Sequence, residues 1–409
     1  MKSVGYEKRM KYENTLIISK YTTSYICESL YEITQSFSCD YGIDKFHKED
    51  SFCYSCNKKN IIDYLKDQCD GNNSVAPFLL GEETVEASEY IKYMFFELKK
   101  EIPSEYDLMI GLEIIEIKKA NISKRNNLLS KVRYITITYL IKRNDDIIAN
   151  DFMVFDELNA NSMNEFINET IYDFTWNRSH KKEFTFSLNS NILFNNKAAG
   201  VLFHECVGHF LEADNYINST LNSDNICDDS ITVYENFNEK SEYDDMGNKI
   251  KKDVMLIKNG KINSLLTDAN FSNILNCHNT GNAITETPDA LPSIRMRNMY
   301  VKEGMEKREK IISGITNGLY VDNISYGEVN YYSGDFFLMP SRSMLIHNGL
   351  IKESITNIPL HFNIKQFNQW KIQLCDDPIT IHSLCLKMGA AKKVAFTAPS
   401  MLLQPRKEL

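Results

Sequence analysis

The stretch LFHECVGHFLEAD, residues 202–214, places two histidines and a glutamate where together they could bind a metal ion. In many zinc peptidases two histidines four residues apart share one helical face, and the glutamate after the first acts as general base. Here the pattern is H-E-x-x-x-H, because His209 follows His204 by five residues. On a straight α-helix this step separates the two side chains by about 140°. They could share an ion only if the helix bulges or ends between them.

A π-bulge adds one residue to a helical turn, would bring both histidines to a common face, and is frequent at functional sites. Gly208 directly precedes the second histidine and tolerates such a distortion. The helix expected at residues 197–213 is apolar on most sides, which predicts that it is buried. Buried polar groups need partners. His204, Glu205 and His209 are therefore expected to form either a satisfied core cluster or a metal site with a third ligand.

The elements around this helix indicate an α+β fold with two domains, residues 1–190 and 191–409. The N-terminal domain is expected to be a sheet with helices, and the C-terminal domain is expected to be rich in strands and to carry the metal-binding helix. Residues 1–80 are polar, and we expect irregular structure there. Apolar residues recur at helical spacing from Thr84, the expected N-cap, to Leu98. A second helix is expected at 162–174. Strands are expected at 108–117, 133–143 and 147–155, and another strand ends at Asn195. Two hairpins are expected within 243–268 and 336–355, with turns at Asn259-Gly260 and Asn348-Gly349.

Composition narrows the class of protein. The net charge of −9 argues against a nucleic-acid partner. We find no signal peptide and no apolar stretch of the roughly 18 residues that a membrane helix needs. Ten cysteines without a secretory signal indicate reduced thiols and a cytoplasmic location. The pair Cys53-x-x-Cys56, flanked by Cys39 and Cys69, could form a small zinc site, but a second such pair is missing, which favours ordinary thiols.

The segment AAGVLFHECVGHFLEAD, residues 198–214, resembles the defining string of the TldD/PmbA family of metallopeptidases, also called modulators of DNA gyrase. The five-residue step between the histidines is the family's own. Further blocks resemble the family in the same order: YDDMGN (243–248), VMLIKNGKINSLLTD (254–268), TGNA (280–283), IRMRNMYV (294–301) and MPSRSMLIHNGLIKE (339–353). The resemblance covers about residues 190–409, and the N-terminal half matches only in the order of its elements.

The resemblance implies a Zn²⁺ site whose ligands are His204, His209 and a distant cysteine. Cys385 begins the segment that matches the family's cysteine block, and Lys387, Gly389 and Pro399 match this block as well. Leu386 and Ala390 depart from the family pattern. Cys375 lies near enough in the sequence to be an alternative ligand. Three protein ligands leave a fourth position for water, as in catalytic zinc sites. Glu205 is then the expected general base, or a carboxylate that only orients a histidine.

Three further residues have open roles. Glu212 and Asp214 could orient a metal-bound histidine, cap the helix end or be solvated. Arg295 could hold a substrate carboxylate, stabilise an oxyanion or form a structural ion pair. The histidines at 278, 347, 361 and 382 have no spacing that implicates them.

The resemblance also implies a zinc-dependent peptidase that hydrolyses peptides or unfolded segments, with maturation or leader removal of a ribosomally made peptide as a specialised role. It implies a homodimer or a heterodimer with a TldD/PmbA-like subunit. The complete H-E-x-x-x-H set resembles the active TldD-like subunit. The alternatives are a non-hydrolytic zinc protein and a pairing subunit, and retention of Glu205 argues against the second. The acidic balance gives gyrase modulation through DNA contact no support.

Overall fold

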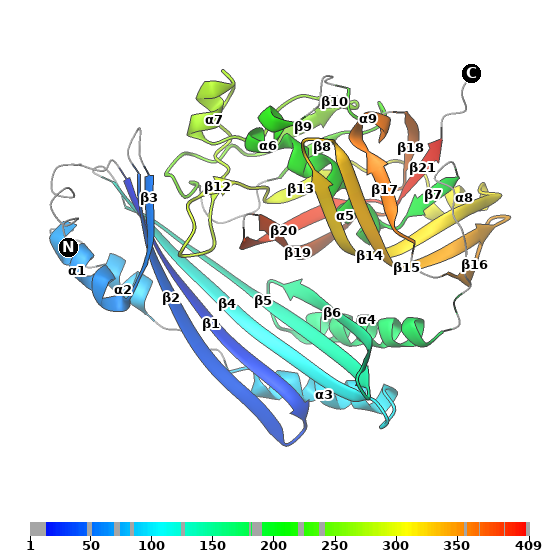
Figure 1. Ribbon diagram of the computed structural model, residues 1–409, viewed down its shortest axis with the longest axis horizontal. Helices are drawn as coiled ribbons and strands as arrows, with labels where there is room; N and C mark the ends of the chain where they lie inside the picture. Colours follow the sequence, from blue (N-terminus) through cyan, green and yellow to red (C-terminus); the bar gives the residue numbers. More distant parts are fainter. Residues whose placement is uncertain are drawn as a thin grey trace.

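The computed structural model describes residues 14–46, 51–68, 74–81, 86–123, 127–179, 181, 190–219, 225–236, 242–355, 358–367, 369–387 and 389–405. It is a mixed α+β structure, as the sequence predicts. The described strands before residue 190 and those after it form separate sheets, and the domain boundary at 190/191 stays a prediction. Figure 1 shows the long N-terminal sheet running below the C-terminal half.

The N-terminal half is built on one antiparallel sheet of six strands in the order β3-β2-β1-β4-β5-β6. Its strands are β1 Asn14–Ser29, β2 Glu32–Phe46, β3 Ser51–Cys56, β4 Asp107–Ser123, β5 Asn127–Arg143 and β6 Asp146–Phe155. The strands expected at 108–117, 133–143 and 147–155 are confirmed, and two of them are longer than expected. Because β6 is the last strand in this order, it leaves one edge of the sheet open.

The expectation of irregular structure in residues 1–80 is wrong, because this segment contains two long strands and a third short one. The reason is that β1 is covered on both faces at its start. Leu16 and Ile18 pack into one core cluster, while Ile17 between them packs into another. A strand buried on both faces does not alternate between apolar and polar residues, so the sequence pattern concealed it.

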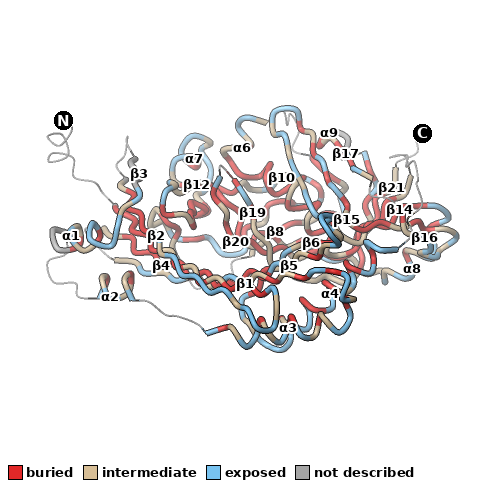
Figure 2. Tube along the Cα trace, turned by 60° about the horizontal axis from the view of Figure 1, so that its bottom comes forward, coloured by how far each residue is buried: buried red, intermediate tan, exposed pale blue. Residues whose placement is uncertain are grey.

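Helices cover parts of this sheet (Figures 1 and 2). They are α1 Lys58–Gln68, α2 Val75–Leu80, α3 Ser88–Glu101 and α4 Ala160–Arg178. The apolar faces of α3 and α4 pack with residues of β4, β5 and β6 in one core cluster. The expected N-cap of α3, Thr84, lies outside the described residues, and the helix begins at Ser88. The second expected helix is confirmed as α4, which begins with a capping box between Asn159 and Ser162.

The C-terminal half contains two larger sheets and a small ribbon. One sheet has the order β10-β9-β8-β13-β20-β19, and the other has the order β16-β15-β14-β7-β21-β18, with β17 paired to β15. The first is made of β8 Val233–Glu235, β9 Val254–Lys258, β10 Lys261–Ile262, β13 Asn298–Val301, β19 Ile379–Lys387 and β20 Ala390–Ala398. The second is made of β7 Asn191–Phe194, β14 Asn317–Asn330, β15 Asp335–His347, β16 Leu350–Ser354, β17 Leu360–Asn363, β18 Trp370–Leu374 and β21 Met401–Pro405. The ribbon pairs β11 Ala283–Ile284 with β12 Ser293–Ile294, and four short helices are α6 Ala213–Asn218, α7 Ala269–Ile274, α8 Arg308–Ser313 and α9 Ile364–Phe367.

Both expected hairpin turns are confirmed. Asn259 and Gly260 have φ angles of 49° and 74°, and Asn348 and Gly349 have φ angles of 48° and 74°. Two consecutive residues with positive φ make the type I′ turn that suits the twist of a two-strand hairpin, and Asn-Gly is the pair that adopts it most readily.

Helix α5, Asn196–Phe203, lies between the two larger C-terminal sheets and contacts β14 on one side and β20 on the other. The Asn195 side chain accepts a hydrogen bond from the Ala198 N–H and caps the helix. Its apolar residues belong to the largest core cluster of the described chain. The burial predicted for this helix is therefore confirmed.

Buried ion pairs join the two halves of the chain. Lys119 of β4 lies 2.7 Å from Asp245, and Arg342 of β15 contacts Asp173 and Glu169 of α4. None of the described helices is long and apolar enough to cross a membrane. Among the described residues, no metal-binding group forms around Cys39 and Cys56. Cys69 lies outside the described residues, as does the side chain of Cys53.

Candidate metal centre

The two histidines of the motif share one face because the helix changes its hydrogen-bond pattern between them. Residues His204–Gly208 form one turn of π-helix, in which the His209 N–H donates to the His204 carbonyl five residues earlier. The imidazole rings lie 4.8 Å apart between centroids. Of the two ways in which the histidines could share an ion, the bulge is thus the one present. Gly208 lets the Met296 side chain pack closely against this turn, since a Cβ at this position would lie 2.3 Å from the Met296 sulfur.

The structure brings Cys385 to the two histidines from the other end of the chain. The possible ligand atoms of His204, His209 and Cys385 lie within 4.8 Å of one another, and all three residues are buried. The Cys385 Sγ lies 3.5 Å from the His209 Nε2. Cys375, the alternative ligand, packs into a different core cluster, where burial raises the pKa of its thiol to about 12. The geometry therefore favours Cys385 as the third donor.

The donor set fits a zinc ion, which accepts mixed imidazole and thiolate ligands. Burial raises the pKa of the Cys385 thiol, but His204 and His209 outweigh it and lower this pKa to about 4. Such a thiol is a thiolate at neutral pH, the form that binds metals. The Nδ1 atom of His204 is buried without a hydrogen-bond partner among the described residues. A buried imidazole nitrogen without a partner is one that an ion or a water molecule can satisfy.

Glu205 lies beside this group and faces a cleft of about 600 Å³. Its Oε2 atom is 3.8 Å from the His209 Nε2, and its side chain is 19% exposed. Burial raises the pKa of its carboxyl, while both histidines oppose that effect. The cleft runs between β6 and α4 of the N-terminal half and β14 and β19 of the C-terminal half, and His209 and Cys385 also line it. A carboxylate with a raised pKa beside a possible metal site is suited to accept and release a proton.

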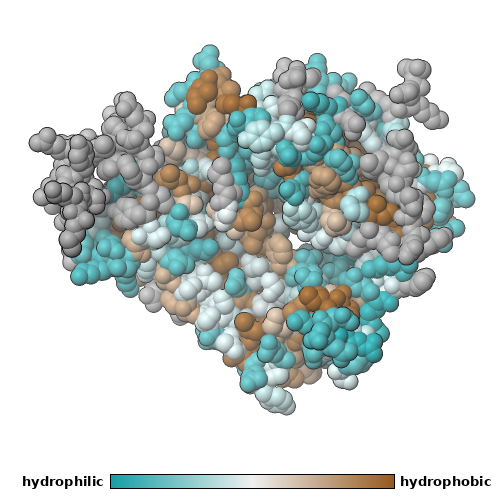
Figure 3. Space-filling model, viewed as in Figure 1, coloured by the Kyte–Doolittle hydropathy of each residue, from teal (hydrophilic) through white to brown (hydrophobic). Residues whose placement is uncertain are grey.

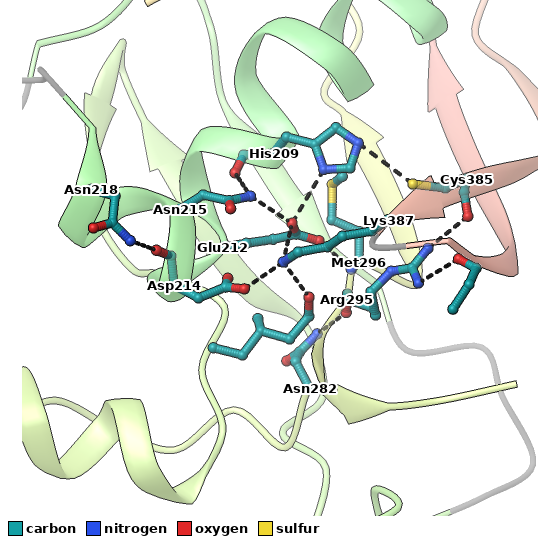
Figure 4. A network of polar contacts seen from close by, with 12 residues as sticks. His209, Glu212, Asp214, Asn215, Asn218, Asn282, Arg295, Met296, Cys385 and Lys387 are labelled. Carbon is teal, nitrogen blue, oxygen red and sulfur yellow. Dashed lines mark hydrogen bonds and ion pairs between the residues drawn. The ribbon is translucent and has the colours of Figure 1, made fainter. Parts of the chain in front are cut away.

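Glu212 contacts the opposite nitrogen of the same histidine (Figure 4). Its Oε2 atom lies 3.2 Å from the His209 Nδ1, and its side chain is fully buried. Burial raises the pKa of Glu212, but His209 and Lys387 lower it to about 2, so the group is ionised. Asn215 donates to both Glu212 and the His209 carbonyl. This geometry supports Glu212 as the carboxylate that orients His209, and it excludes a solvated carboxylate.

Asp214 and Arg295 lie near the site without touching the histidines. Asp214 accepts a hydrogen bond of 2.7 Å from Lys387. Arg295 is 2% exposed and donates to the main-chain carbonyls of Cys385 and Ala390. Its hydrogen-bond partners among the described residues are main-chain carbonyls, it does not line the cleft, and a contact of Arg295 with substrate stays a prediction.

Sequence reasoning missed two contributors to the site and gave one histidine no role. In the sequence Lys387 stands out only as a match to the family's cysteine block, yet its side chain contacts Glu212 and Asp214. Its position two residues after Cys385 on a strand was the available signal, since such residues share a face. Gly327 of β14 packs against Glu205 and carried no local signal. His382 lines the cleft but does not belong to the possible metal group.

Comparison with known proteins gives this site a context. The family model described as the PmbA/TldA metallopeptidase C-terminal domain matches residues 188–405. A metalloprotease TldD homologue from Buchnera aphidicola is 30% identical over 218 residues, which cover 50% of this chain and 45% of the relative. A zinc metalloprotease TldD homologue from Saccharolobus solfataricus is 30% identical over 176 residues, which cover 41% of this chain and 39% of the relative. The matched region therefore spans less than half the length of these curated relatives.

The overall fold is shared with solved structures. TldE from Thermococcus kodakarensis superposes with a TM-score of 0.66 at 15% identity, covering 96% of this chain and 95% of that one. A candidate modulator of DNA gyrase from Thermotoga maritima superposes with a TM-score of 0.68 at 13% identity, covering 96% and 94%. At such identities the likeness concerns the fold alone. Because the family model matches more than half of the 409 residues, this chain belongs to the TldD/PmbA metallopeptidase family.

Proposed function

We propose that this chain is a zinc-dependent peptidase that hydrolyses peptides or unfolded protein segments. The observation that carries the proposal is one arrangement. His204, His209 and Cys385 converge within 4.8 Å of one another, and Glu205 lies beside them on the wall of a cleft. One of its relatives is named a zinc metalloprotease. The family membership and the donor set support the same ion.

Bound zinc would supply Lewis-acid polarisation of a peptide carbonyl and activation of water. The chain's own residues would do the rest. Glu205 would accept a proton from the attacking water and transfer it to the leaving amine. Its partial burial favours this role, because the raised pKa brings the carboxyl closer to the pH at which it must gain and lose a proton. Glu212 would keep the Nδ1 proton on His209 and so leave Nε2 free to bind the ion.

Strand β14 supports binding of an extended substrate. It pairs with β7 only from Gly318 to Val321, and beyond that point its described pairing is with β15 alone. Its open edge from Asn323 to Val329 lines the cleft. An extended peptide can add to such an edge through main-chain hydrogen bonds. Because Gly327 of this edge packs against Glu205, a peptide bound there would pass the proposed general base.

The finer roles are proposed from the family resemblance. They are removal of a leader from a ribosomally made peptide, assembly as a homodimer or with a TldD/PmbA-like subunit, and a cytoplasmic location. The principal alternative is a pairing or non-hydrolytic member of the family. Glu205 argues against the pairing subunit, because such a subunit has no need for a partly buried carboxylate beside three possible metal ligands.

The test is to measure zinc content and peptide cleavage together in four proteins: wild type, His204→Ala, Cys385→Ala and Glu205→Gln. We expect about one zinc per chain in the wild type and in Glu205→Gln, and little in the other two. Cleavage of a mixture of unstructured peptides, followed by mass spectrometry, should occur in the wild type alone. A zinc-loaded wild type that cleaves no peptide would favour the non-hydrolytic alternative. A wild type that binds no zinc would favour a pairing subunit.

A further inference from the structure

We propose that Lys387 and Arg295 are positioning residues that preassemble the metal ligands through buried contacts between the segment 294–296, the hairpin of β19 and β20, and the end of the motif helix. Neither residue is a ligand, and the inference rests on the metal site of the proposed function. Figure 4 shows the Lys387 ammonium between Glu212 and Asp214, and the Arg295 guanidinium beside the Cys385 carbonyl. Both side chains are therefore directed at groups that hold the ligands.

Arg295 fixes the main chain at the cysteine. One terminal nitrogen donates to the Cys385 carbonyl at 2.6 Å, and the other donates to the Ala390 carbonyl at 3.1 Å. Cys385 lies on β19 and Ala390 begins β20, so a single guanidinium ties together the two strands of this hairpin. The planar, rigid fork of arginine suits two such acceptors, which a lysine could not span. With the main chain held, the Cys385 sulfur has few positions open to it.

Lys387 links the same strand to the second histidine. Its ammonium donates to the Glu212 carboxylate at 3.0 Å, to the Asp214 carboxylate at 2.7 Å and to the Ile294 carbonyl at 2.9 Å. These three acceptors account for all three donors that a lysine has. Its side chain is 5% exposed, so solvent competes little for these bonds.

A series of contacts connects two of the proposed ligands, His209 and Cys385. His209 contacts Glu212, Glu212 accepts from Lys387, and Lys387 follows Cys385 by two residues on β19. The Met296 N–H also donates to Glu212, which ties the segment 294–296 to the end of the motif helix. The distance from the His209 Nε2 to the Cys385 Sγ is thus set by protein contacts alone. A site held in this way loses little freedom when the ion binds.

The consequence is measurable as metal affinity and as ligand geometry. Groups that orient metal ligands typically change affinity by about 10–100-fold when removed. We therefore expect Lys387→Met and Arg295→Met to bind Co²⁺, a spectroscopic substitute for zinc, about 10–100-fold more weakly than the wild type. The thiolate-to-cobalt absorption band should weaken or shift in both variants, because the Cys385 sulfur is no longer held.

Two matched variants separate positioning from general destabilisation. Arg297→Met removes an arginine two residues away that is 1% exposed but contacts the Gly281 carbonyl and Glu235 instead. Lys118→Met removes a 4% exposed lysine of β4 that contacts Glu116 and the Gly81 carbonyl instead. Cobalt titration and the thermal midpoint of the metal-free protein are measured for all variants. We expect the two control variants to keep the cobalt affinity and the absorption spectrum of the wild type, even if their thermal midpoints fall.

The outcomes decide between the ideas. Wild-type affinity and spectrum in Lys387→Met and Arg295→Met would overturn the inference, as would an equal loss in the two controls. If the methionine variants do not fold, Lys387→Arg and Arg295→Lys take their place, and a weaker affinity at a near-wild-type midpoint supports the inference. A wild type that binds no cobalt would overturn the proposed function together with the inference. A wild type that binds cobalt normally but cleaves no peptide would overturn the proposed peptidase activity alone.

Discussion

Gly327 offers a direct test of how the cleft positions the proposed general base. A Cβ at this position would lie 2.4 Å from the Glu205 Cγ and 3.1 Å from its Cδ. Carbon atoms normally pack about 3.5–4.0 Å apart, so Gly327→Ala would displace the Glu205 side chain by about 1 Å. A misplacement of that size can cost about 100-fold in rate, which corresponds to about 2.7 kcal/mol in the activation barrier.

We expect Gly327→Ala to lower kcat for peptide cleavage by about 100-fold and to leave zinc content unchanged, because none of the three proposed ligands moves. The backbone at this position accepts alanine, since Gly327 does not have a positive φ and alanine suits a strand better than glycine, so any loss of stability comes from the contact with Glu205. The matched control is Gly314→Ala, where φ is −84° and the nearest atom to a new Cβ lies 3.5 Å away. Wild-type kcat in a folded, zinc-loaded Gly327→Ala protein would refute the assignment of Glu205 as general base.

Three further predictions follow from the charges around the cleft. Arg342 is buried against Glu169, Asp173 and Asp322, so Arg342→Met should cost roughly 3–5 kcal/mol of unfolding free energy in urea denaturation; a loss below 1 kcal/mol would contradict this. Burial raises the pKa of Asp151 to about 6, so this group favours the folded state less as pH rises from about 4 to 6, and Asp151→Asn should remove its part of the pH dependence of stability. If the unfolding free energies of the wild type and Asp151→Asn depend on pH in the same way, this prediction is wrong. Among the described residues lining the cleft, six carboxylates accompany one lysine. Peptides with lysine should therefore show a higher kcat/KM than the same peptides with glutamine, and the ratio of the two values should fall as the salt concentration rises. Equal kcat/KM values for the two kinds of peptide would contradict this prediction.

Figure 3 shows hydrophilic and hydrophobic residues mixed over one face of the molecule. Exposed apolar residues near the cleft include Phe152, which is 40% exposed and lies on the open edge strand β6. Single exposed apolar residues are ordinary on protein surfaces. The predicted preference for lysine-containing peptides depends on the carboxylates of the cleft alone.

The motif helix and the turns could be predicted from the sequence because short-range interactions determine them. The five-residue spacing of His204 and His209 left a bulge or a helix end as the two ways to share an ion, and a π-turn is present. The Asn-Gly pairs predict type I′ turns, and both occur. In each case the interacting groups are neighbours in the chain, so local geometry was sufficient. The N-terminal strands were missed for the opposite reason. For β1, burial on both faces at its start depends on which elements cover it, and this removes the alternation that a sequence reveals.

The site as a whole was decided by tertiary structure. The sequence by itself determined which residue types could bind a metal and which family they resemble. It could not choose by spacing between Cys375 and Cys385, nor give Lys387 a contact or place Gly327 beside Glu205. Cys385 lies 176 residues after His209, and only the packing of β19 against the motif helix brings them together. Contacts over such separations depend on how the sheets pair and pack, and no local pattern of residues encodes that arrangement.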